Sequence, residues 1–154
     1  MPSLLPVISK AVPLIYENAS TNEFHEFFTH FLETWSREST TAVASYSFSV
    51  EISQILPFLG LCASRYIKIF LGIMTKRLMF SKSISHTAKF LIALRTLCEQ
   101  TYPVIRANSK EINTLIEKAK EIAKENDSGD KKRIYDECDR IEDILRNSPE
   151  LPEF

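Results

Sequence analysis

Residues 58–80, FLGLCASRYIKIFLGIMTKRLMF, form the most apolar stretch of this sequence and decide its fold. At helical spacing the polar side chains of this stretch fall near one narrow stripe, and large apolar side chains cover most of the remaining surface. The stripe contains Ser64, Lys68, Gly72, Thr75 and Lys76. A helix that is apolar over so much of its surface must be enclosed by other helices or by lipid. We therefore expect a central, largely buried helix over residues 58–80.

The composition favours an all-α fold. The 44% hydrophobic and 25% charged residues are ordinary for a globular protein. The sequence contains 3 glycines in 154 residues, against an average usage of about 7%. Because tight turns and hairpins consume glycine, this scarcity indicates long helices with short connections. We predict a single-domain, all-α bundle of five to seven helices over residues 1–148, with a frayed tail over residues 149–154.

The segments around the central stretch carry helical patterns. Ser20 and Glu23 have the spacing of a capping box, at the start of a helix expected over residues 22–37. One face of that helix is aromatic, and we expect it to lie mainly in the core. Further helices are expected to end near residues 101, 126 and 146. Over residues 3–18 the apolar residues also recur at helical spacing, but Pro13 must end or kink any helix there.

Residues 42–52 are ambiguous. Their apolar side chains alternate with Ser45, Ser47, Ser49 and Glu51, which is typical of a half-buried strand. A helix also fits this pattern, and a single strand would have no partner in the sequence. We favour a helix that ends near Pro57.

We expect neither the apolar N-terminus to be a secretory signal nor the 58–80 stretch to span a membrane. Three prolines interrupt the apolar N-terminus and no charged region precedes it, so we expect no secretory signal. The 58–80 stretch has two basic residues near its middle and two near its end, each costing roughly 2.5–3.5 kcal/mol at a bilayer centre. We expect a buried helix there rather than a spanning one.

Charge is segregated along the chain. Residues 1–60 carry two basic and six acidic side chains, residues 61–106 eight basic and one acidic, and residues 107–154 nine basic and thirteen acidic. Three interpretations of the basic 61–106 segment stay open: it neutralises the acidic N-terminal helices, it binds an acidic protein partner, or it docks on anionic lipid. Nucleic acid is disfavoured, since the sequence lacks the features of RNA-binding sheets and of helix-turn-helix modules.

No catalytic or metal-binding signature is present. The cysteines Cys62, Cys98 and Cys138 lack ligand or redox spacing, and no nucleophile or phosphate-binding loop can be found. Residues 86–89 (HTAK) resemble the H-x-x-K core of histidine phosphotransfer domains, in which a helix-borne histidine accepts phosphate. Phe90 stands where that family has a small glycine, and its bulk would crowd a docking receiver domain. We therefore expect no enzyme, cofactor or metal.

We expect a non-enzymatic adaptor or regulatory module that binds a protein partner, possibly an acidic one, through aromatic or basic helix faces. The alternative is a peripheral membrane protein that docks on anionic lipid through residues 61–106. We expect a cytoplasmic chain, associated with membranes in the alternative, and its oligomeric state stays open. The predicted contact residues are Phe27, Phe31 and Trp35 on the aromatic face, and Lys76, Arg77, Lys82 and Lys89 on the basic segment.

Overall fold

The structure is a computed structural model, and it describes residues 15–17, 20–37, 42–80, 84–125, 129 and 131–146. In these ranges the chain is helical throughout apart from short turns, and it has no strand. Residues 15–17 are helical, and the remaining elements are, in order, α2 (Thr21–Arg37), α3 (Ala42–Leu59), the 3-10 helix η1 (Gly60–Tyr66), α4 (Ile67–Phe80), α5 (Ile84–Thr101), the 3-10 helix η2 (Val104–Asn108), α6 (Ser109–Glu125) and α7 (Lys131–Arg146). The predicted all-α bundle is confirmed.

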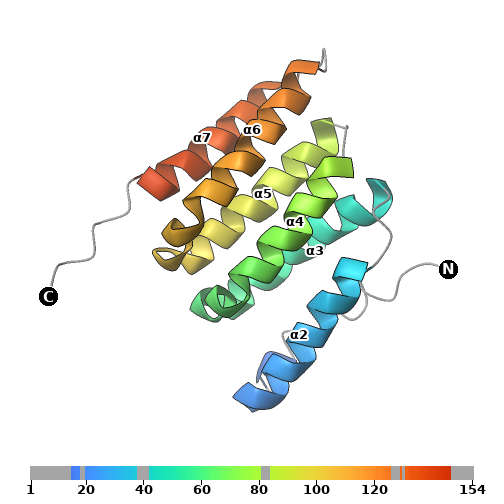
Figure 1. Ribbon diagram of the computed structural model, residues 1–154, viewed down its shortest axis with the longest axis vertical. Helices are drawn as coiled ribbons and strands as arrows, with labels where there is room; N and C mark the ends of the chain where they lie inside the picture. The colour runs from blue at the N-terminus through green and yellow to red at the C-terminus, as the bar shows by residue number, and fades with distance from the viewer. Residues whose placement is uncertain are drawn as a thin grey trace, which may run out of the picture.

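The long helices run back and forth along one direction and pack in two layers (Figure 1). In one layer α3 contacts α5 and α5 contacts α7; in the other, α2 contacts α4 and α4 contacts α6. Helices α4 and α6 also contact α5, which joins the layers. Because α3, α5 and α7 all end at the same end of the bundle, η1 and η2 lie at that end together (Figure 1).

Helix α5 occupies the middle of the bundle. It contacts α3, α4, α6 and α7 as well as both 3-10 helices. Its buried residues include Phe90, Leu91, Leu94 and Leu97. The central position predicted for residues 58–80 therefore belongs equally to α5, although most of the large apolar side chains of the 58–80 stretch are buried as expected.

The 58–80 stretch is not one helix, and this part of the prediction was wrong. Helix α3 continues through Pro57 to Leu59. Gly60 then adopts φ +52°, the left-handed conformation in which a helix commonly ends at a glycine. The chain reverses through η1, and α4 runs back beside α3. Helices α3 and α4, which are neighbours in sequence, thus partly cover each other's apolar side chains.

Helix α4 nevertheless keeps the predicted stripe. Lys68, Gly72, Thr75 and Lys76 are all exposed on its outer side, whereas the side chains between them pack inward. The helical interpretation of residues 42–52 is also confirmed, since all of them belong to α3.

Helix α2 packs through aromatic rings. Phe28 is fully buried; its ring centroid lies 4.9 Å from that of Tyr66 and 6.1 Å from that of Phe70. The capping box at the start of α2 is confirmed. The Glu23 N–H donates to Ser20 Oγ at 3.2 Å, and the Ser20 N–H donates to Glu23 Oε2 at 3.5 Å.

Ion pairs join the C-terminal helices. The Arg95 Nε of α5 lies 2.8 Å from the Glu137 Oε2 of α7, whose side chain is 8% exposed. Glu137 also pairs with Arg140 at 3.3 Å. The Lys120 Nζ of α6 lies 3.2 Å from the Glu142 Oε1 of α7. One cation of the basic 61–106 segment, Arg95, is thus paired with the C-terminal helix α7 rather than with the N-terminal helices.

The aromatic cluster under α2 predicts a large effect of Phe28→Ala. Removing this fully buried ring should lower the free energy of unfolding by about 3–5 kcal/mol, because the lost burial and the remaining cavity both cost stability. Chemical denaturation measures this change. Phe58→Ala is the control; since Phe58 is 53% exposed, its change should stay within about 0.5 kcal/mol. Equal losses in both variants would contradict the packing of α2.

Gly60 and Gly72 should respond oppositely to alanine. A Cβ at Gly72 meets no atom within 4 Å, so Gly72→Ala should raise the free energy of unfolding by about 0.5–1 kcal/mol through lower unfolded-state entropy. A Cβ at Gly60 also meets nothing, but its φ of +52° strains any L-residue. Gly60→Ala should therefore cost about 1–2 kcal/mol. Thermal and urea unfolding of both variants would check the pair, and stabilisation by Gly60→Ala would refute the reversal.

Candidate docking surface

The large exposed apolar side chains of the described residues gather at one end of the bundle. Phe58 is 53% exposed, Leu61 64% and Val104 52%. Phe58 belongs to the last turn of α3, Leu61 to η1 and Val104 to η2. Both 3-10 helices contact α5 and lie at the same end of the molecule (Figure 1). We call this surface the 3-10 end.

Local sequence explains why these side chains point outward. Pro57 precedes Phe58 two residues before α3 ends, and Pro103 precedes Val104 two residues after α5 ends. At these reversals the inward positions are taken by Leu59, Ala63 and Ile105, which are at most 2% exposed. Leu61 and Cys62, between Leu59 and Ala63, are exposed.

The two 3-10 helices are basic. Arg65 in η1 and Arg106 in η2 are both exposed, and neither 3-10 helix contains an acidic residue. The sequence has no Asp or Glu between residues 52 and 98. An exposed apolar side chain and an exposed arginine therefore occur together in each 3-10 helix.

The start of α2 and residues 15–17 border this end. The Tyr16 hydroxyl lies 3.5 Å from Cys62 Sγ, and this hydrogen bond to Cys62, together with the charge and burial there, raises the pKa of Tyr16. The His25 Nδ1 lies 3.0 Å from the Tyr66 hydroxyl. Burial raises the pKa of Tyr66, and the charge of Arg65 partly offsets this. The exposed Glu17, Glu23 and Glu26 consequently lie on the same side of the molecule as η1.

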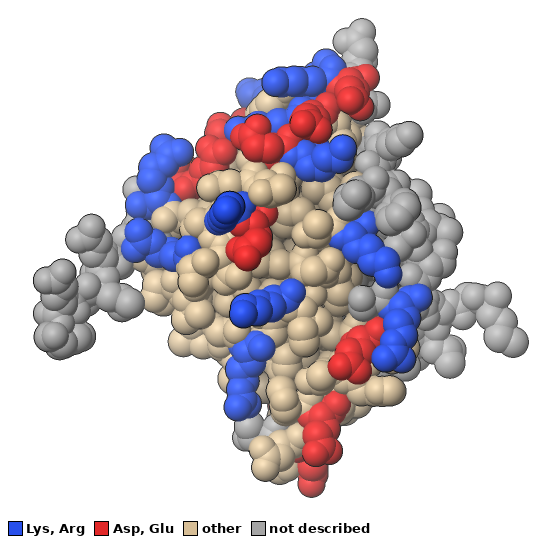
Figure 2. Space-filling view, in the orientation of Figure 1, with Lys and Arg blue, Asp and Glu red and all other residues tan. Residues whose placement is uncertain are grey.

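Two hollows follow the exposed stripe of α4. One, of about 430 Å³, lies between α2 and α4, with Glu33, Arg37 and Lys68 among its lining residues. The other, of about 250 Å³, lies between α4 and α6, where Asn108 and Glu111 line it. Lys68 and Gly72 line both. Figure 2 shows mostly uncharged surface between scattered cations over α4, and closely mixed charges over α6 and α7. The α4 hollows are shallow and carry both signs of charge.

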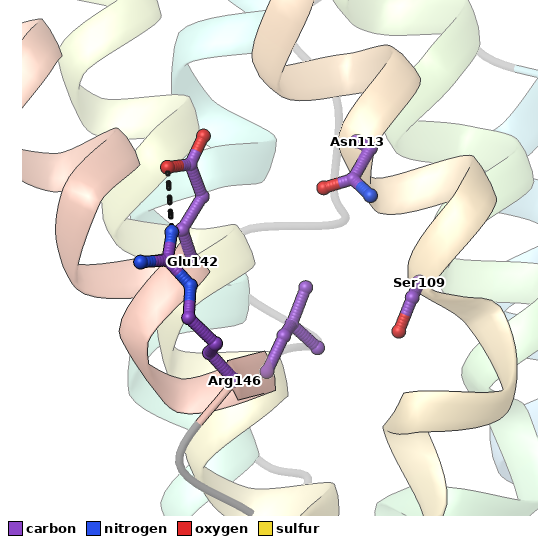
Figure 3. Close-up of a pocket in the computed structure, with 5 residues that line it drawn as sticks. Ser109, Asn113, Glu142 and Arg146 are labelled. Atoms are coloured by element: carbon purple, nitrogen blue, oxygen red, sulfur yellow. Dashed lines mark ion pairs between the residues drawn. The ribbon is translucent and has the colours of Figure 1, made fainter.

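A third hollow, of about 240 Å³, lies between α6 and α7 (Figure 3). Glu142 and Arg146 face Asn113 and Ser109 across it, and Arg146 Nη2 lies 3.6 Å from Glu142 Oε2. The Ser109 hydroxyl donates to the Arg106 carbonyl at 2.7 Å, and Glu142 is held by two cations. This arrangement ties α6 to α7 and offers no activated nucleophile.

The described contact residues predicted from the sequence lie on different helices. Phe31 is 3% exposed and belongs to the core, and Phe27 is half-buried against it. Lys76 is exposed on α4, and Lys89 is half-buried on α5. The side chains of Trp35 and Arg77, and the whole of Lys82, lie outside the described residues. Because Phe31 is buried, we do not carry it into a docking site.

Sequence reasoning missed the 3-10 end. Periodicity marks Phe58, Leu61 and Val104 as ordinary apolar positions, and it cannot tell which of them face outward where the chain reverses. A usable signal was present: in both places a proline directly precedes an apolar residue, and an arginine follows within eight positions.

The structure also bears on His86, on metal binding and on the membrane-spanning alternative. His86 is half-buried on α5, and the neighbouring Phe90 is 3% exposed. Among the described residues no group of three His, Cys, Asp or Glu side chains could hold a metal ion. Within the same ranges, Ser49–Lys76 is long and apolar enough to cross a membrane by length and composition, with 44% of its most apolar window buried. The core helices of soluble proteins pass the same test.

No protein-family model, no curated protein and no solved structure matches this chain.

The thiols should differ sharply in reactivity. Burial raises the pKa of Cys98 to about 12 and of Cys138 to about 12, so neither forms a thiolate at pH 8, whereas Cys62 is exposed. Titration with a chromogenic disulfide at pH 8 should detect one reactive thiol per folded chain, and all three in denaturant. Cys62→Ser should abolish the fast reaction. Rapid reaction of Cys98 or Cys138 in that variant would contradict the packing of α5 and α7.

Proposed function

We propose that this chain is a non-enzymatic docking module that binds its target with the 3-10 end. The observation that carries this proposal is the convergence of Phe58, Leu61 and Val104, the large exposed apolar side chains of the described residues, at one end of the bundle. Exposed apolar groups clustered at one site mark binding surfaces more often than scattered ones do.

Two further features support a docking role over catalysis. In the third hollow Ser109, Glu142 and Arg146 are engaged in hydrogen bonds and ion pairs, and the α4 hollows are shallow. Enzyme sites are usually concave pockets in which a few polar groups converge. The 3-10 end instead combines exposed apolar side chains with exposed arginines, which is typical of recognition rather than of catalysis.

The fold is suited to presenting such a surface. Helices α3 and α5, joined by α4, hold η1 and η2 at fixed positions, and the pairs Arg95–Glu137 and Lys120–Glu142 fasten α7 to α5 and α6. The side chains that project from the 3-10 end therefore belong to a rigid support. A preorganised surface loses less conformational entropy on binding than a flexible loop does.

Site-specific photocrosslinking would test this proposal. A benzophenone amino acid placed at position 61 or at position 104 should crosslink to the same target in cells that naturally make the protein. The control position is Glu117, which is exposed on α6 away from the 3-10 end. Agreement between positions 61 and 104, which lie far apart in the sequence, is the expected result. Crosslinking at 117 as strong as at 61 and 104 would overturn the proposal.

A further inference from the structure

We propose that the target of the 3-10 end is an anionic lipid surface, into which Phe58, Leu61 and Val104 insert while Arg65 and Arg106 meet the headgroups. This inference rests on the docking function proposed above and specifies its partner. The first observation that supports it is the composition of the two 3-10 helices. An apolar side chain and an arginine occur together in η1, and again in η2.

The size of the apolar cluster favours lipid over protein. A stable protein interface takes about 800 Å² from each partner. Three side chains that are each about half exposed fall well short of that area. A bilayer sets no such threshold, because each side chain that enters the acyl boundary adds to binding independently of shape.

The geometry of the bundle also suits end-on docking. The helices run toward the 3-10 end (Figure 1), so a flat surface placed against that end meets the two 3-10 helices together with the start of α2. Interfacial groups reach about 5–10 Å into the headgroup and acyl boundary, a depth that side chains on a helix tip can span. The flanks of the bundle, which carry mixed charges over α6 and α7 (Figure 2), stay in water.

The electrostatic contribution should be substantial, although nearby carboxylates reduce it. Arg65 and Arg106 attract anionic headgroups, but Glu17, Glu23 and Glu26 lie on the same side of the molecule near η1. Each cation near such a surface contributes a factor of about five to binding. Binding should therefore depend on both the apolar side chains and the two arginines, and high salt should weaken it without abolishing it.

Vesicle sedimentation tests the inference, using phosphatidylcholine vesicles with and without one quarter phosphatidylserine, at about 0.1 M and 0.5 M salt. The wild type should pellet with the anionic vesicles and at least about tenfold less with neutral ones. Phe58→Ser combined with Leu61→Ser and Val104→Ser should lose binding by more than about tenfold. Arg65→Glu with Arg106→Glu should lose about 30-fold or more.

The matched control is Lys132→Glu with Arg133→Glu. It changes the net charge by the same amount, and both residues are exposed at the start of α7, at the opposite end of the bundle (Figure 1). This variant should bind nearly as well as the wild type. A larger loss in the control than in the Arg65 and Arg106 variant would assign lipid binding to the opposite end and overturn the inference.

An environment-sensitive fluorophore on Cys62, which is exposed next to Leu61, supplies a second measurement on the folded protein. Its emission should shift to the blue with anionic vesicles only. No pelleting and no shift would overturn the lipid inference. If lipid binding fails but positions 61 and 104 crosslink to one protein, the docking function stands with a protein target. If they also share no crosslinked target, both the lipid inference and the docking function are refuted.

Discussion

The structure depends on the reversal of the chain at Gly60. The most apolar part of the sequence would otherwise continue as one long helix through residues 49–76, long enough to cross a membrane. The φ of +52° at Gly60 ends α3 after Leu59, and η1 turns the chain so that α4 packs beside α3. The two halves of the apolar stretch contact each other, α3 packs mainly on α5, and α4 also packs on α5, α6 and α2. Glycine adopts this conformation with little strain. Gly60 therefore determines whether α3 and α4 fold back on each other or continue as one long helix.

The same reversal produces the surface to which we assign function. A chain that turns sharply after an apolar helix leaves some apolar side chains without a neighbour, and here these are Phe58 and Leu61. Thr101 ends α5 in a similar way, and Val104 is exposed just beyond it. Natural sequences often place charged residues at such sites to prevent association. The docking function proposed here would use the large apolar residues beside Arg65 and Arg106 at this end.

Much of the fold could be predicted because it follows from local patterns. The capping box of Ser20 and Glu23, the aromatic face of α2 and the extent of α7 depend on residues close in sequence, and the structure has them as expected. The interruption of residues 58–80 could not be predicted. We expected a helix to end near Pro57, whereas α3 continues to Leu59 and ends at Gly60, three residues after that proline. The docking surface was missed for a related reason. Its members are 43 positions apart, from Leu61 to Val104, and only the packing of η1 and η2 on α5 brings them to one end.

The distance between positions 61 and 104 tests this account most directly. Spin labels on cysteines introduced at Leu61 and Val104, in a Cys62→Ser background, can be measured by pulsed electron resonance with and without anionic vesicles. Both 3-10 helices pack on α5, and packed helix axes lie about 8–10 Å apart, so the labels should give a single distance of about 10–25 Å in both conditions. A distribution centred beyond about 35 Å would contradict the packing of η1 and η2 at one end of the bundle and the surface that they form.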